Sequence, residues 1–185
     1  EITPQGNTLE VGCGIGLSSR YLASTRSVMS IDNNEYLIEK TAGILKDLDH
    51  PPKIFHADIF DLGSDAEFQI QDFAPEVLVG WFIGSHPDDI DLRTPSSLPR
   101  NEKPKKYREN IEDLITTKLA SNKSVEYIHL ANRAGASSEA SREDIIKSTT
   151  DDYNTHVFHP GGFEVVDVEV LNWDRDGSNF MYVNA

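Results

Sequence analysis

Residues 8–17 read Thr8-Leu9-Glu10-Val11-Gly12-Cys13-Gly14-Ile15-Gly16-Leu17, a short apolar segment that runs into three closely spaced glycines. Glycine tolerates positive φ and lets a ligand come close to the main chain, and a helix that begins at such a turn offers unpaired N–H groups. We therefore predict a strand that turns sharply into a helix and holds a nucleotide at the turn.

The spacing of these glycines differs from that of a dinucleotide-binding turn. The G-x-G-x-x-G fingerprint requires a glycine at position 17, where this chain has Leu17, and the third glycine comes one residue early, at Gly16. Glu10 lies two residues before the first glycine, and an acid there suits a ligand with a cationic end better than a diphosphate. An NAD-dependent oxidoreductase is therefore the less favoured alternative.

The stretch 10–16 resembles the E-x-G-x-G-x-G signature of the class I, Rossmann-like S-adenosylmethionine-dependent methyltransferases. Two later segments agree with this resemblance, since Ser30-Ile31-Asp32-Asn33 and His56-Ala57-Asp58-Ile59-Phe60 each end an apolar run. The resemblance implies S-adenosylmethionine as the cofactor, with Asp32 on the ribose hydroxyls, Asp58 near the adenine amino group and Ile59 beside the ring. The cofactor-binding residues that it implies are Glu10, Gly12, Gly14, Gly16, Asp32, Asn33, Asp58 and Ile59.

The interval between the first glycine and the first acid supports the ribose role. Gly12 and Asp32 are separated by the ~20 residues expected between the glycine turn and a ribose-binding acid in one βαβ unit. For Asp58 an alternative stays open, because an aspartate after a strand also caps a following turn.

The apolar pattern predicts an α/β fold, and the resemblance implies that it is a Rossmann-like three-layer sandwich. Strands are predicted at 8–11, 27–32, 53–58, 75–84 and 124–132, with amphipathic helices between most of them. Residues 163–171 alternate with period two, and 180–183 read as a final strand with no helix in between. We therefore expect a mostly parallel seven-stranded sheet with a C-terminal antiparallel hairpin, which the resembling family also has.

The methyl acceptor is expected at the end of the fourth strand, where the resemblance places the donor sulfur. Residues 80–89 lack the Asn/Asp-Pro-Pro-Tyr/Phe pattern associated with amino methylation of bases. His86 is the first candidate for a general base and Asp88 the second, and the alternative for His86 is a surface histidine before a proline. The turn-rich segment 85–103 is a candidate lid over the acceptor.

Three further residues are candidates for substrate contact. Trp81 walls the donor or acceptor site or belongs to the core, and Asn132 and Arg133 follow the fifth strand, where either substrate contact or turn chemistry fits. No metal is expected, because His156 and His159 are three residues apart without an evident third ligand.

Composition limits the partners and the setting. The 185 residues fit one domain, 1–185, and the formal net charge of −14 makes a nucleic-acid acceptor unfavourable. Cys13 is the single cysteine, which favours a reducing, cytoplasmic setting, and no apolar run approaches the ~20 residues of a membrane span. The chain begins at Glu1 rather than Met, which is compatible with a fragment that lacks an upstream segment.

The function expected from these features is transfer of a methyl group from S-adenosylmethionine to a small-molecule or protein acceptor by in-line displacement. A noncatalytic S-adenosylmethionine-binding or partner subunit with the same fold is the alternative. The sequence identifies neither the acceptor atom nor the oligomeric state.

Overall fold

The computed structural model describes residues 3–135 and 139–172, and its framework is a sheet of five parallel strands in the order β3-β2-β1-β4-β5. The strands are β1 (Thr8–Val11), β2 (Val28–Asp32), β3 (Lys53–His56), β4 (Val77–Trp81) and β5 (Tyr127–Ala131). β1 pairs with β2 on one side and with β4 on the other, so the strand order reverses beside it. Ligands of open α/β sheets bind at such a switch point, outside the carboxyl ends of the strands.

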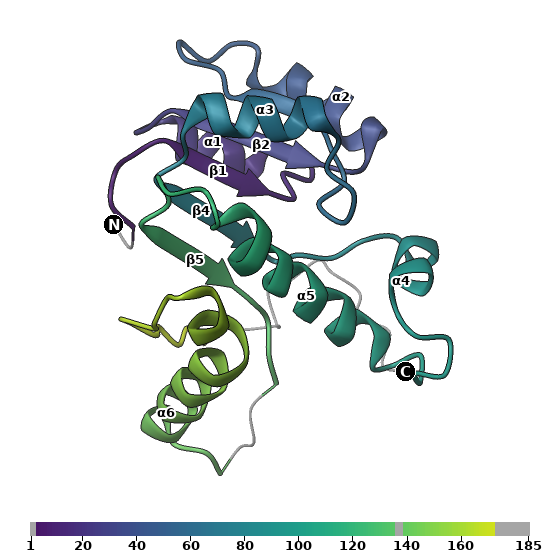
Figure 1. Cartoon of the computed structure of the whole chain (residues 1–185), viewed down its shortest axis with the longest axis vertical. Helices are drawn as coiled ribbons and strands as arrows, with labels where there is room; N and C mark the ends of the chain where they lie inside the picture. Colours follow the sequence, from purple (N-terminus) through teal and green to yellow (C-terminus); the bar gives the residue numbers. More distant parts are fainter. Residues whose placement is uncertain (1–2, 136–138, 173–185) are drawn as a thin grey trace.

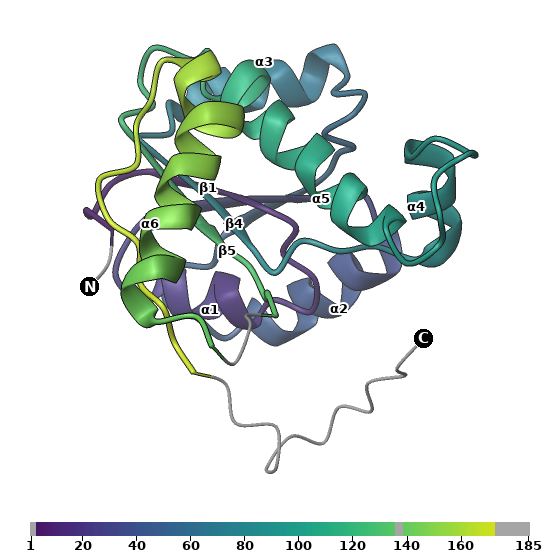
Figure 2. The same cartoon turned by 90° about the horizontal axis from the view of Figure 1, so that it is seen from below.

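Helices cover both faces of this sheet. Figure 2 shows α1 (Leu17–Ala23) and α2 (Glu35–Leu45) on one face, and α3 (Ser64–Phe73) and α5 (Lys103–Leu114) on the other. α5 continues into a π-helical turn, Ile115–Leu119. α6 (Arg142–Tyr153) lies beyond β5 and continues into a π-helical turn, Asn154–Phe158, and a 3-10 turn, His159–Gly161 (Figure 1).

The central strands are buried on both faces, as expected of parallel strands between two helical layers. Leu9 of β1 and Leu78 of β4 are fully buried in the larger core, which α5 closes with Tyr107 and Ile111. A smaller core on the other face packs Leu22 of α1 against the central strands.

Within residues 3–135 and 139–172 the sheet has five strands instead of the predicted seven, and no antiparallel hairpin is present there. Residues 163–171 form no strand, although they alternate as one, and Val166 is 86% exposed. The alternation of apolar and polar residues is typical of a strand with one solvent-exposed face. A strand also needs a neighbouring strand with which to form backbone hydrogen bonds. Instead, the Phe163 N–H donates to the Phe158 carbonyl and the Val165 N–H to Asn154 Oδ1. The predicted strand 180–183 lies outside the described residues.

The segment 85–103, predicted to be a turn-rich lid, contains a seven-residue helix, α4 (Pro87–Arg93). His86 caps this helix by accepting the Asp88 N–H at Nδ1 (3.4 Å), and Pro87 fits the first turn, where a missing N–H costs nothing. Figure 1 shows α4 beyond the carboxyl ends of the strands, next to the start of α5. No helix in residues 3–135 and 139–172 has the length and apolar composition needed to cross a membrane.

Candidate functional site

The glycine turn after β1 has the backbone conformation that its sequence predicts. Gly12, Gly14 and Gly16 have φ values of 81°, 53° and 82°, a region that residues with a Cβ rarely adopt. A Cβ on Gly16 would also lie 2.6 Å from Thr41 Cγ2 of α2. Thr41 in turn donates from Oγ1 to the Gly14 carbonyl at 2.7 Å. The turn therefore needs glycine for its backbone and, at Gly16, for the close approach of α2.

Asp32 joins the end of β2 to this turn. One carboxylate oxygen accepts the Gly14 N–H and the other accepts the Asn34 N–H, both at 2.9 Å. An ionised carboxylate has about four acceptor positions, so about two stay available to a ligand hydroxyl.

Glu10, near the end of β1, is buried next to the glycine turn. It is 1% exposed, and its Oε2 accepts the hydroxyls of Ser19 (2.5 Å) and Ser30 (2.7 Å). Its Oε1 has no hydrogen-bond partner among the described residues. This carboxylate ties α1 to β2.

A cavity of about 360 Å³ opens at the carboxyl edge of the sheet. Most of the predicted cofactor residues line it, namely Gly12, Gly14, Asp32, Asn33, Asp58 and Ile59, whereas Glu10 and Gly16 do not. The opposite wall comes from the segment after β4 and from α5, with Phe82, Ser85, His86 and Tyr107. We call this the donor cavity, after the ligand that the sequence resemblance implies. A second cavity of about 510 Å³ shares Asn33, Ala57 and Asp58 with it.

Asp58 has two kinds of partner. Its Oδ1 accepts the Phe60 N–H at 2.9 Å, so the turn-capping alternative is realised. Its Oδ2 pairs with the guanidinium of Arg93 on α4, which lies over the Phe60 ring at 4.8 Å from the centroid. Sequence reasoning did not find Arg93, because nothing local connects it to a residue 35 positions earlier.

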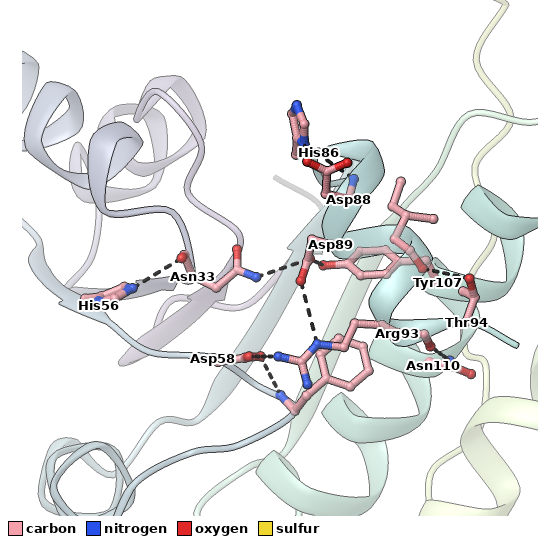
Figure 3. Close-up of polar contacts among 12 residues, drawn as sticks. Asn33, His56, Asp58, His86, Asp88, Asp89, Arg93, Thr94, Tyr107 and Asn110 are labelled. Carbon is pink, nitrogen blue, oxygen red and sulfur yellow. Dashed lines mark hydrogen bonds and ion pairs between the residues drawn. The ribbon is translucent and has the colours of Figure 1, made fainter. Parts of the chain in front are cut away.

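Asp89 is the centre of a polar cluster that the sequence also did not reveal. Figure 3 shows its carboxylate between the amide of Asn33 and the hydroxyl of Tyr107, with Arg93 beside it. Tyr107 donates at 2.7 Å, Asn33 Nδ2 donates at 3.3 Å and Arg93 Nε lies 3.6 Å away. Burial alone raises the pKa of Asp89, but hydrogen bonds from Tyr107, Ser85 and Asn33 and the charge of Arg93 outweigh burial, and this pKa lies below its usual value.

The two candidates for a general base differ in their access to the cavity. His86 lines it, whereas Asp88 does not. Both side chains are largely exposed, and His86 Nδ1 lies 3.4 Å from Asp88 Oδ2. His86 therefore borders the donor cavity, whereas Asp88 lies beside His86 and outside the lining.

The predicted substrate residues lie outside the lining of the donor cavity. Trp81 faces the α1 layer, where its Nε1 donates to His129 Nδ1 at 3.3 Å and its ring packs on Tyr21. Asn132 donates to Glu112 Oε1 (2.6 Å) and to the Tyr153 hydroxyl (2.7 Å).

Arg133 does not line the donor cavity but contacts a residue that does. Its guanidinium lies 5.0 Å from the ring centroid of Phe82, which lines the cavity. Phe82 has a φ of 53°, which an L-residue adopts at a cost, and it was not singled out from the sequence.

Two other predictions concern reactive groups. Burial, followed by the charges of Asp32 and Glu10, raises the pKa of Cys13 to about 12, which fits packing rather than nucleophilic attack. Among the described residues, no group of three or more His, Cys, Asp or Glu is placed to hold a metal ion.

No protein-family model and no curated protein matches this chain. Solved structures do, at low identity. Magnesium protoporphyrin IX methyltransferase from Synechocystis PCC 6803 with bound S-adenosylmethionine is 18% identical over 80% of this chain and 59% of its own, with a TM-score of 0.46. An S-adenosylmethionine-dependent methyltransferase from Clostridium acetobutylicum ATCC 824 is 14% identical over 57% and 37%, with a TM-score of 0.36.

The plantazolicin methyltransferase BpumL in complex with S-adenosylhomocysteine is a further match, 20% identical over 41% of this chain and 27% of its own, with a TM-score of 0.31. The chain therefore spans between about a quarter and three fifths of the length of these three proteins. In its α/β arrangement the chain is similar to S-adenosylmethionine-dependent methyltransferases.

Proposed function

We propose that the chain binds S-adenosylmethionine in the donor cavity and transfers the methyl group to a small-molecule or protein acceptor by in-line displacement. The observation that carries this proposal is the meeting of residues from three separate sequence motifs, represented by Gly14, Asp32 and Asp58, around one cavity of about 360 Å³.

Each of these residues has an atom available for a part of the donor. Asp32 retains acceptor positions for the ribose hydroxyls after binding the Gly14 and Asn34 N–H groups. Asp58 accepts one N–H and is paired with Arg93, so it offers the adenine amino group a hydrogen-bond acceptor without a large net charge. Ile59 adds an apolar surface for the ring.

The donor brings an already activated methyl group. The chain therefore has three tasks, which are to bind the donor and the acceptor, to align them, and to exclude water. His86 is the proposed base when the acceptor must lose a proton, because it lines the cavity and its side chain is exposed enough to exchange protons. Asp88 would act through His86. The contacts of Trp81 and Asn132 favour supporting roles, whereas Arg133 is placed to reach an acceptor beside Phe82.

The remaining parts of the proposal concern extent and partners. We propose one domain over residues 1–185, in a reducing, cytoplasmic compartment consistent with the single cysteine. The net charge of −14 favours a small-molecule or protein acceptor over nucleic acid.

Calorimetric titration of S-adenosylhomocysteine into the wild type and into Asp32→Ala tests the cofactor site. We expect wild-type binding and a loss of about tenfold or more in the variant, because hydrogen bonds to a charged group are removed. Asp72→Ala is the matched control, since Asp72 is exposed on α3 and does not line the cavity. Unchanged affinity in Asp32→Ala would contradict the site, and NADH binding in place of S-adenosylhomocysteine would favour an oxidoreductase.

The noncatalytic alternative predicts the same titration but no turnover. A panel of amine, hydroxyl, imidazole and carboxylate acceptors, assayed with labelled S-adenosylmethionine and with His86→Ala beside the wild type, separates the two. Methylation that falls in His86→Ala supports catalysis with a base. Binding without transfer to any acceptor class favours the partner subunit.

A further inference from the structure

Helix α4 has no buried residue of its own, and Leu92 in its last turn is 74% exposed. A seven-residue helix is too short to be stable by itself in water, so tertiary contacts must hold it. Ile90 of α4 packs against the larger core, and polar contacts of α4 reach three other parts of the chain. They run to α5, to the end of β3 and to the loop after β2.

Asp89 is where the contacts of α4 converge (Figure 3). Its Oδ2 accepts the Tyr107 hydroxyl from α5 and the Asn33 amide from the loop after β2. Its Oδ1 faces Arg93, which also pairs with Asp58 at the end of β3. One carboxylate therefore connects α4, α5 and the carboxyl edge of two strands.

Asn33 is the point at which this cluster reaches the proposed ligand. It lines both cavities, whereas Asp89 lines only the 510 Å³ cavity. The Asn33 carbonyl lies 3.2 Å from His56 Nε2, so the residue is engaged at its main chain as well as at its side chain. Loss of the Asp89 contact would free the Asn33 amide to rotate within the donor cavity.

We infer that Asp89 is a positioning residue that holds α4 closed against the sheet edge and, through Asn33 and Arg93, fixes the geometry of the donor cavity. The effect on ligand affinity rests on the proposed function, but the attachment of α4 does not. Asp89 then governs the affinity for the methyl donor without lining the donor cavity.

The test compares Asp89→Asn with Asp91→Asn. Asparagine keeps the size of the side chain but removes the charge and replaces one acceptor with a donor. Asp91 is the matched control, since it lies on the same helix and pairs with Lys103 of α5 at 2.6 Å rather than with Asn33. Tyr107→Phe removes only the hydroxyl that Asp89 accepts.

Two measurements are made on each variant. Hydrogen exchange of the ligand-free chain reports the closure of α4, and we expect faster exchange of peptides over 85–93 and 32–35 in Asp89→Asn. Titration with S-adenosylhomocysteine reports the cavity, and we expect affinity to fall about tenfold in Asp89→Asn and less than about twofold in Asp91→Asn, because only the first loses charged hydrogen bonds at the cavity edge. Tyr107 also lines the donor cavity, but Phe keeps its ring there and removes only the hydroxyl that Asp89 accepts, so Tyr107→Phe should add little to Asp89→Asn in the double variant.

The outcomes separate this inference from the proposed function. Equal affinity and equal exchange in Asp89→Asn and the wild type would overturn the inference while leaving the function standing, and so would an equal loss in Asp91→Asn. A wild type that does not bind S-adenosylhomocysteine would defeat the proposed function, and the exchange of α4 would still decide whether Asp89 holds the helix. Should Asp89→Asn fail to fold, Tyr107→Phe carries the same expectations with a smaller effect.

Discussion

The two halves of the candidate site are held together by different kinds of contact. In the β1–β3 half, main-chain N–H groups bind Asp32 and a glycine lies against Thr41, so the geometry follows from the backbone. In the half after β4, side chains bind one another, with Asp89 and Arg93 at the centre. A backbone-held site tolerates little change, whereas a side-chain-held one can open without unfolding. Substitutions in the first half should therefore mainly destabilise the fold. Substitutions in the second half should mainly release α4 from the edge of the sheet.

Gly16→Ala should have the largest effect on stability, because it changes the half of the site that the backbone holds. The new Cβ would lie 2.6 Å from Thr41 Cγ2 on a residue with a φ of 82°, and we expect a loss of about 2–4 kcal/mol in the free energy of unfolding. Urea denaturation measures this loss. Thr41→Ser removes the clashing methyl group and keeps the hydroxyl that binds Gly14, so it should restore part of the loss in the double variant.

Gly43→Ala is the matched control for that experiment. Gly43 lies in α2 with nothing within 4 Å of a new Cβ, and we expect a change of less than about 1 kcal/mol, in the stabilising direction, because alanine favours helix. Equal stabilities of Gly16→Ala and Gly43→Ala would show that the turn after β1 is not constrained by its backbone.

The difference between the halves also explains what the sequence could predict. The glycines and Asp32 form a local unit of about 20 residues, in which spacing alone implies contact. Asp89 and Arg93 carry no such signal, because their partners come from β3 and α5 and meet only when the helices pack.

Strand periodicity explains why Trp81 and Asn132, each a candidate for substrate contact or for a supporting role, are engaged away from the donor cavity. A Cβ on Gly80 would meet Ile83 and Ile115 on the α5 side, so the next residue, Trp81, points to the α1 side. Position at a strand end follows from the sequence pattern, but the face of the strand decides which layer the side chain meets. Asn132 follows β5 in the same way and turns toward Glu112 and Tyr153.

Arg93→Ala should have a smaller effect on stability than Gly16→Ala, because it changes the half of the site that side chains hold. It leaves Asp58 and Asp89 without their shared cation, and we expect a loss of about 1–2 kcal/mol in the free energy of unfolding. Arg93→Lys keeps the charge but not the fork that reaches two carboxylates, so it should recover only part of the loss. Thermal unfolding checks both variants. A loss as large as that of Gly16→Ala would remove the distinction between the halves.

Glu112→Gln should have the smallest effect on stability, and this effect should depend on pH. Burial raises the pKa of Glu112 above its ordinary value of 4.5, against hydrogen bonds from Asn132 and Tyr153 and the charge of Arg108. The folded state therefore holds the proton more tightly than the unfolded state, and the wild type loses stability as pH rises from that ordinary value through the raised one. Glutamine does not titrate, so the stability of the variant relative to the wild type should rise with pH across this interval. Above the interval the difference in stability should stay constant.

Denaturation of the wild type and Glu112→Gln at several pH values measures that gain. Tyr153→Phe sharpens the result, because it keeps the carboxyl and removes a donor to its charged form, so its stability should fall more steeply with pH than that of the wild type. A difference between Glu112→Gln and the wild type that stays constant with pH would mean that the carboxylate is already fully compensated by its partners.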